Sequence, residues 1–214
     1  MIHFGSLFAT LVLAHSAISV PVEVERRDVD AATKALLTAA PTSNTCSGAT
    51  YPNECATAQQ AAQPIIDGFA QYGITTVGEQ AAALSIMIFE SGSFKYNEKH
   101  FPAPVPGQGT RNMQNPEFNQ KYVADLEKSG KLKSSDVQAA GTDPNKILAL
   151  VQPDEFSFAS AAWFISTQCD AATRAGLQAG TQAGYTAYLT NCVQTTVTDD
   201  RISGWKAALQ AASG

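Results

Sequence analysis

Helix-forming patterns run through almost the whole chain, and alternating runs of β-branched residues are scarce. Alanine, the strongest helix former, is frequent throughout, whereas strands need a two-residue alternation of apolar and polar side chains. The 214 residues suit one domain of medium size. We therefore predict about eight helices in an all-α domain, or an α-dominated α+β domain, without a sheet of note.

Capping and breaking residues set the predicted helix boundaries. The helices are expected over residues 28–40, 56–72 with a break at Pro64, 76–90, 116–128, from 143 onwards, 154–168, 171–189 with glycine interruptions, and from Thr198 or Asp199 to the end. The segment 76–90 opens with a capping box, Thr76 and Glu79, and is apolar on most faces, so it should be the buried central helix. Residues 95–115 form a long loop rich in proline and glycine, which favours a functional role.

The first residues predict export. An apolar run from Leu7 to Leu13 is followed by small residues at Ala17 and Ser19, which fits a signal peptide over residues 1–19 better than a buried N-terminal helix. Residues 20–27 end in a dibasic pair and resemble a propeptide of eukaryotic, especially fungal, secretory pathways. The mature chain is then expected to start at position 28, to be extracellular and to have no membrane contact. Residues 28–55 would form an N-terminal helix and disulfide loop, and residues 56–214 the main domain.

The four cysteines suit an exported protein, because an even number predicts two disulfides. Three pairings are possible, and we favour Cys46–Cys55 and Cys169–Cys192 because each closes a short local loop. A zinc site is disfavoured, since no two cysteines are spaced C-x-x-C and one histidine, His100, remains after processing. We expect no metal.

Charge and missing motifs exclude several classes of function. Lys and Arg total 14 against 19 for Asp and Glu, and the net charge of −5 argues against nucleic-acid binding. No phosphate-binding loop or dinucleotide fingerprint occurs, so no cofactor is expected. A serine or cysteine hydrolase needs a histidine base, and the G-x-S-x-G nucleophile motif is absent.

Glu90 is the most informative single residue, because it follows a run of mostly apolar residues at the end of the predicted central helix. Apolar surroundings and the negative end of the helix dipole both favour a protonated carboxyl over a carboxylate. A protonated carboxyl is what a general acid needs for glycoside cleavage. The alternative is a solvated glutamate where the helix reaches the surface.

A family resemblance rests on the same segment. Glu90-Ser91 at the end of an alanine-rich helix, followed by a glycine-rich loop that ends in Arg111-Asn112-Met113-Gln114, resembles soluble lytic transglycosylases and goose-type lysozymes. The resemblance covers residues 77–120. Arg111-Asn112 stand where those families have Gly-Leu, and Ala183-Gly184-Tyr185 only loosely echoes their later Ala-Tyr-Asn motif. The resemblance implies a lysozyme-like helical domain whose central buried helix ends at the catalytic glutamate.

The resemblance also implies roles for the matching residues. Glu90 would protonate the glycosidic oxygen and then act as a base, and Ser91 would orient its carboxyl group. Arg111, Met113 and Gln114 would bind the sugar. The alternative for Ser91 is a helix C-cap, and that for Arg111 and Gln114 is a surface loop.

Ordinary hydrolysis would require a second carboxylate. The candidates are Glu98, Glu117 and Asp125, each of which could instead be a solvated charge. Three aromatic residues could stack on sugar rings or belong to the core: Tyr96, Phe101 and Tyr122.

The sequence thus predicts a secreted, monomeric enzyme that cleaves β-1,4-linked amino-sugar polymers, with peptidoglycan favoured and a polysaccharide as its partner. The alternatives are a chitinase or chitosanase on the same scaffold, or a non-catalytic secreted interaction protein.

Overall fold

The computed structural model describes residues 22–213, and every regular element among them is helical. Sheet-like pairing in this range is limited to two isolated bridges, Glu98 with Gly109 and Gly109 with Gln114. The prediction of an all-α fold is therefore confirmed.

The helices are α1 (Val22–Ala39), the 3-10 helix η1 (Pro41–Asn44), α2 (Ala58–Tyr72), α3 (Val77–Glu90), α4 (Pro116–Lys128), α5 (Ser134–Ala140), α6 (Pro144–Val151), α7 (Asp154–Ser157), α8 (Ser160–Gln168), α9 (Ala171–Gln178), α10 (Gln182–Ala187), the π-helix η2 (Tyr188–Val193) and α11 (Asp199–Ser213). None of the described helices combines the length and the apolarity that a bilayer crossing needs.

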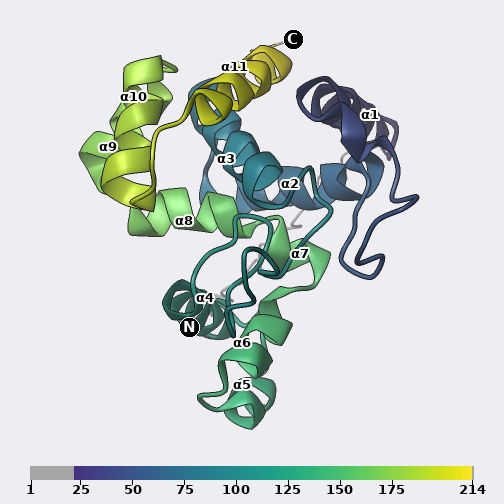
Figure 1. Ribbon diagram of the computed structural model, residues 1–214, viewed down its shortest axis with the longest axis vertical. Coiled ribbons are helices and arrows are strands. Elements are labelled where there is room, and N and C mark those ends of the chain that lie inside the picture. The colour runs from purple at the N-terminus through teal and green to yellow at the C-terminus, as the bar shows by residue number, and fades with distance from the viewer. Residues whose placement is uncertain (1–21, 214) are drawn as a thin grey trace, which may run out of the picture.

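Helix α3 lies at the centre of the fold, as predicted from its apolar composition. It is covered by α11 on one side and by α8 and α9 on others (Figure 1). Nine of its 14 residues are buried, among them Leu84, Ile86 and Met87. Because α3 is buried along most of its length, its last residue is fixed relative to the core.

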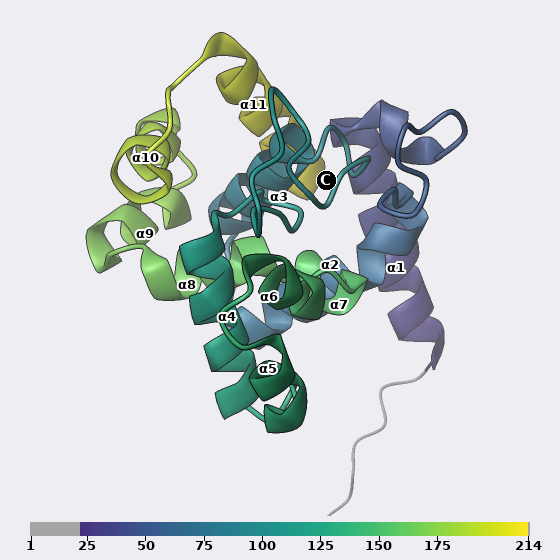
Figure 2. The ribbon, with the colours of Figure 1, turned by 60° about the horizontal axis from the view of Figure 1, so that its bottom comes forward.

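A second, smaller core lies below α3 in Figure 1, where α4 packs against α6. Its largest member is the fully buried Trp163 of α8, whose ring lies 4.8 Å from that of Tyr122. Figure 2 shows α4, α5 and α6 grouped on one side of the molecule, with the loop 91–115 running above them. The described part of the chain thus contains two hydrophobic cores, and α8 contributes side chains to both.

The predicted break at Pro64 is wrong, because α2 runs through this proline without interruption. Proline removes one hydrogen bond and usually kinks a helix. Here a capping box of Thr57 and Gln60 starts the helix, and the residues around the proline, Ala61, Ala62 and Ile65, are buried in the main core. Tertiary packing therefore outweighs the local preference of proline.

The segment 154–168 also differs from the expectation of a single helix. It divides into α7 and α8 at Phe158 and Ala159, both of which are buried. Phe158 packs edge to face on Phe94 at a ring distance of 5.3 Å. The division directs this aromatic ring into the core.

The glycine interruption predicted within residues 171–189 occurs at Gly180, whereas Gly176 and Gly184 do not interrupt a helix. Gly180 takes a left-handed conformation, φ 63°, after the end of α9. Gly176 and Gly184 instead stay inside α9 and α10, where the two helices meet, and a Cβ on Gly184 would lie 1.9 Å from the Gly176 oxygen. Any larger residue at Gly184 would therefore force α9 and α10 apart.

The predicted capping box at the start of α3 is half formed. Thr76 caps the helix by accepting a hydrogen bond from the Glu79 backbone N–H at 3.3 Å. The Glu79 side chain does not close the box: it is fully buried and forms an ion pair with Arg174 of α9 at 2.6 Å. This contact joins α3 to α9.

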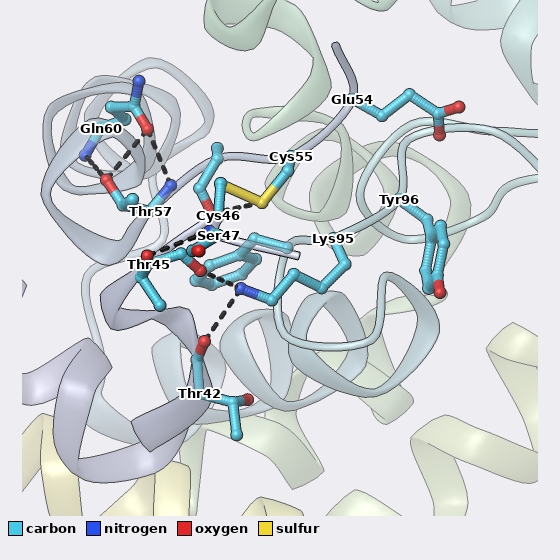
Figure 3. The surroundings of a disulfide bond; sticks show 12 residues. Thr42, Thr45, Cys46, Ser47, Glu54, Cys55, Thr57, Gln60, Lys95 and Tyr96 are labelled. Carbon is cyan, nitrogen blue, oxygen red and sulfur yellow. Dashed lines mark hydrogen bonds between the residues drawn. A yellow bond between two sulfur atoms is a disulfide. The ribbon is translucent and has the colours of Figure 1, made fainter. Parts of the chain in front are cut away.

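Both disulfides have the favoured pairing. Cys46–Cys55 and Cys169–Cys192 have Cα separations of 5.8 and 5.2 Å. The first braces the loop before α2, and Figure 3 shows Lys95 reaching across to the carbonyls of Thr42 and Thr45 beside it. Disulfides persist in oxidising compartments, which fits the predicted export.

The predicted signal peptide, residues 1–19, lies outside the described residues. Helix α1 includes the dibasic pair, and both Arg26 and Arg27 are exposed on it. Cleavage after Arg27 stays a prediction, as does the division at residue 56. The position of the pair on a surface helix leaves it accessible to a protease.

Candidate active site

Glu90 ends α3 at the edge of a cavity of about 350 Å³. Its side chain is 24% exposed, so it is neither buried in the core nor fully solvated. The cavity is lined by Ile86, Glu90, Lys99, Gln108, Asn112, Met113, Gln114, Asn115, Phe118, Phe164, Tyr188, Val193, Gln194, Thr195 and Arg201. Of these lining residues, Glu90 is the only acidic one. The alternative of a fully solvated glutamate on an outer surface does not apply.

The loop 91–115 brings Met113 and Gln114 to Glu90, as their place in the sequence motif implied. Gly109 holds this loop together through its two bridges, and a Cβ at this position would lie 2.5 Å from the Asn97 oxygen. The Gln114 side chain is fixed by donating a hydrogen bond to Asn119 Oδ1 at 2.7 Å. Glu90, Met113 and Gln114 therefore share one cavity.

Four further amide residues line the cavity: Gln108, Asn112 and Asn115 on the same loop, and Gln194. Gln108 donates from Nε2 to the Met113 carbonyl at 3.0 Å. The Oδ1 of Asn112 accepts hydrogen bonds from Thr110 at 2.7 Å and from Ser160 at 2.8 Å. Amide side chains held in this way can donate to and accept from the hydroxyl and N-acetyl groups of sugars.

Apolar side chains also line the cavity. Phe118 of α4 and Phe164 of α8 meet edge to face at 4.8 Å, and Val193 of η2 lies beside them. The cavity therefore combines charged and amide groups with a few apolar side chains, and such polar groups can fix the orientation of a ligand.

Arg201 is a charged residue of the cavity lining that sequence reasoning missed. Its Nη2 donates to Glu90 Oε1 at 2.6 Å, and its side chain is 9% exposed. The guanidinium carbon also lies 4.0 Å from the centre of the Phe89 ring. One signal was available in the sequence: a cation in the first turn of a helix is disfavoured by the dipole, and so calls for a carboxylate partner.

Two buried tyrosines lie close to this ion pair. Tyr188 lines the cavity, and Tyr185 forms a hydrogen bond with Ser85 at 2.9 Å between the hydroxyl oxygens. Burial raises the pKa of both phenols above the ordinary value of 10.0, with Glu90 adding to the rise and Arg201 opposing it. The sequence analysis gave Tyr185 only a loose motif match and did not consider Tyr188, the residue that reaches the cavity.

The buried phenols give a testable alkaline titration. Burial also raises the pKa of Tyr72 and Tyr122, so four of the six tyrosines are affected. Since their folded pKa values exceed the unfolded value, the stabilisation is complete below pH 10.0 and is lost as the pH rises above it. We expect the phenolate absorbance of these four to appear together with unfolding, as followed by circular dichroism. Titration of all six near pH 10 in a folded protein would contradict this.

Ser91 does not orient the Glu90 carboxyl group as the resemblance implied. It is fully buried, its Oγ donates to the Met87 carbonyl at 2.6 Å, and the same atom accepts from the Phe94 backbone N–H at 2.9 Å. Its contacts are those of a helix C-cap, the alternative considered for it. Ser91 thus fixes the turn after α3 and lies outside the cavity lining.

Arg111 also has structural contacts, and it does not line the cavity where the resemblance implied that it would bind sugar. The side chain is buried and donates to the carbonyls of Glu54, Phe94 and Tyr96, with an ion pair to Asp154 at 3.0 Å. Burial lowers the pKa of its guanidinium, and the negative charges of the Asp154 and Glu54 carboxylates oppose this effect. Arg111 supports the loop from beneath.

None of the three candidate second carboxylates lines the cavity. Glu117 is exposed on α4, and Glu98 belongs to the bridge with Gly109. Asp125 accepts a hydrogen bond from Trp163 Nε1 at 2.8 Å, so its carboxylate is directed to the second core. A paired-carboxylate arrangement is therefore absent among the residues that line this cavity.

The aromatic candidates also lie elsewhere. Tyr122 is fully buried in the second core, so it cannot stack on a sugar. Tyr96 and Phe101 pack edge to face at 5.9 Å in a cluster around His100, which pairs with Glu54 at 2.7 Å. In the described range, no three His, Cys, Asp or Glu side chains gather into a metal-binding group.

Comparison with known proteins gives one partial similarity to report. No family model matches the chain, and no solved structure matches it. A bifunctional dioxygenase–epoxy alcohol synthase of Fusarium oxysporum is 36% identical over 139 residues. The matched stretch covers 64% of this chain and 11% of that protein. The chain thus corresponds to a small part of the relative.

Proposed function

We propose that this chain is a secreted enzyme that cleaves β-1,4-linked amino-sugar polymers, with Glu90 as its acid and base. One observation carries the proposal: a single carboxylate, Glu90, at the end of the buried central helix shares a cavity with Met113, Gln114 and four further amide residues. Of the site residues that the resemblance to lytic transglycosylases and goose-type lysozymes implies, Glu90, Met113 and Gln114 share this cavity, whereas Ser91 and Arg111 lie outside its lining.

The single carboxylate favours transglycosylation over ordinary hydrolysis. Glu90 gives its proton to the glycosidic oxygen as the bond to the anomeric carbon breaks. The carboxylate then takes the proton of a hydroxyl on the same sugar, whose oxygen bonds to the anomeric carbon and closes an anhydro ring. The proton returns to Glu90, so no second carboxylate is consumed or required.

The substrate that we favour is peptidoglycan, and chitin or chitosan is the alternative within the same chemistry. The Fusarium relative is an enzyme by its printed name, but this chain matches 11% of it, and nothing in the cavity specifically favours the relative's printed activities. A non-catalytic secreted interaction protein is the remaining alternative.

The proposal is tested with the mature protein on peptidoglycan, chitin and chitosan, with the products analysed by mass spectrometry. We expect soluble fragments with anhydro ends from peptidoglycan. Fragments with reducing ends would overturn transglycosylation and require a second base. If none of the three polymers yields fragments, the enzymatic proposal fails and the interaction protein is left.

A further inference from the structure

We propose that a second cavity, separate from that of Glu90, binds a long-chain carboxylate, with the alkyl chain between α1, α2, α3 and α11 and the carboxylate at Lys34. This binding site does not depend on the proposed glycan cleavage, because the two cavities share no lining residue. Leu84 lines the second cavity and Ile86 lines that of Glu90. Residues two positions apart lie about 200° from each other around a helix, so the cavities adjoin nearly opposite sides of α3.

The second cavity has the size and the lining of a small-ligand site. Its volume is about 890 Å³, within the range of ~300–1,000 Å³ in which such sites fall. Helix α1 forms one wall and packs against both α2 and α11 (Figure 1). The buried residues of the lining are all apolar: Leu36, Ile65, Ile74 and Leu84. The inner part of the cavity therefore offers apolar surface to a ligand.

The polar side chains of this cavity lie toward the solvent. All of them are exposed except Gln80, which is half-buried. Gln80 Nε2 donates to the Ile74 carbonyl at 3.3 Å, and Thr38 Oγ1 donates to the Lys34 carbonyl at 3.0 Å. A peptide segment in the cavity would bring backbone N–H and C=O groups that need partners once they leave water. An alkyl chain brings no such groups, so it suits this lining better than a peptide.

Lys34 is the one charged residue of the lining. It is exposed on α1, and within the described part of the chain its ammonium group has no ion pair or hydrogen bond. A cation at the edge of an apolar cavity is complementary to an amphiphile whose head group is an anion. The α1 residues of the lining, 31–38, follow the predicted cleavage site after Arg27, so processing there would leave this wall in place.

A free carboxylate fits the cavity better than a membrane lipid or a second copy of the chain. Both of those partners would need large apolar side chains that project from the surface around the cavity. The large apolar residues that are exposed in the described range lie elsewhere, and none of them lines the cavity. A single alkyl chain needs only the recessed apolar surface between the four helices.

The first test is isothermal titration calorimetry with octanoate, decanoate and decanol, each below its critical micelle concentration and at low ionic strength. We expect saturable one-to-one binding, with decanoate about tenfold tighter than octanoate because two more methylenes leave water. Lys34→Gln should weaken decanoate by about two- to fivefold and leave decanol unchanged. Lys206→Gln, at an exposed position outside the lining, should match the wild type. Unless Lys34→Gln weakens decanoate more than decanol, the head-group assignment is overturned.

The second test places the ligand in this cavity. Ala35→Phe fills it from α1, where Ala35 is half-buried, and should weaken decanoate by about tenfold or more. The matched control Ala139→Phe, at an exposed position of α5, should bind like the wild type. If Ala35→Phe does not give the circular dichroism spectrum of the wild type, Ala70→Phe obstructs the cavity from α2 instead. Decanoate binding that is unchanged in a folded filled variant overturns the site.

The same variants separate the other occupants. A wild type that binds no decanoate overturns the proposal. In that case, a dimer in sedimentation velocity that Ala35→Phe abolishes would assign the cavity to a second copy, and binding to phosphatidylglycerol vesicles that it abolishes would assign the cavity to a membrane. A protein that binds decanoate with the expected dependence on Lys34 but cleaves no glycan contradicts the proposed function alone.

Discussion

Glu90→Gln is expected to lower the rate of glycan cleavage by about 100- to 10,000-fold, the contribution typical of a positioned general acid. The amide keeps the size of the side chain, and its oxygen can still accept the Arg201 hydrogen bond that the carboxylate accepts at 2.6 Å. It has no proton to give to the glycosidic oxygen. The expected loss is therefore chemical and not structural, and it is measured as the rate of release of soluble fragments from cell walls.

The matched control is Glu117→Gln, which makes the same replacement at an exposed position of α4 outside the cavity lining. It should cleave at the wild-type rate, and both variants should give the circular dichroism spectrum of the wild type. A Glu90→Gln protein that clears cell walls as fast as this control would show that the acid is another residue.

Arg111→Met should have the largest effect on stability, lowering the free energy of unfolding by about 3 kcal/mol or more. Methionine keeps much of the apolar stem but removes the donor to three carbonyl oxygens. The Phe94 oxygen keeps the Ala56 backbone N–H at 2.9 Å, so the oxygens of Glu54 and Tyr96 are the two that lose their donor. Each buried acceptor left unpaired costs about 1–3 kcal/mol. The stacking of the guanidinium on Phe158, at 4.6 Å, is also lost.

Urea denaturation of Arg111→Met and of Lys131→Met, an exposed lysine, separates burial from the loss of a charge. Arg111→Met should unfold at a clearly lower urea concentration, whereas the free energy of unfolding of Lys131→Met should stay within about 0.5 kcal/mol of that of the wild type. Equal midpoints would mean that the carbonyls find other partners. Because Arg111 supports the loop 91–115, its loss should also weaken cleavage by displacing Met113 and Gln114.

The central helix could be predicted from the sequence because its signals are local. Thr76 caps it, and its apolar residues leave no polar face, which alone requires burial. The same local reasoning failed at Pro64, where the cost of a proline is visible in the sequence and the compensating burial of Ala61, Ala62 and Ile65 is not. Local sequence patterns predict the helices well, but tertiary packing decides whether an unfavourable residue such as Pro64 is tolerated inside one.

The candidate site was predicted in part for a related reason. The family resemblance implied that Met113 and Gln114 lie near Glu90, and these three residues do share a cavity. The resemblance cannot show which side of the loop a side chain takes, so Ser91 and Arg111 were expected in the cavity but bond to backbone beneath it. Arg201 requires knowledge of how α11 crosses α3, which no local pattern contains.

The separation of Glu90 and Arg201 along the chain also has a consequence for biosynthesis. Arg201 lies 111 positions after Glu90, and at usual rates of translation this stretch takes on the order of 10 s to add. Throughout that interval the nascent chain already contains the helix that ends in the carboxylate, but not the residue that pairs with it. Helix α3 is therefore synthesised before the arginine that pairs with its last residue. A chain released at any point before Arg201 would contain Glu90 without its ion-pair partner.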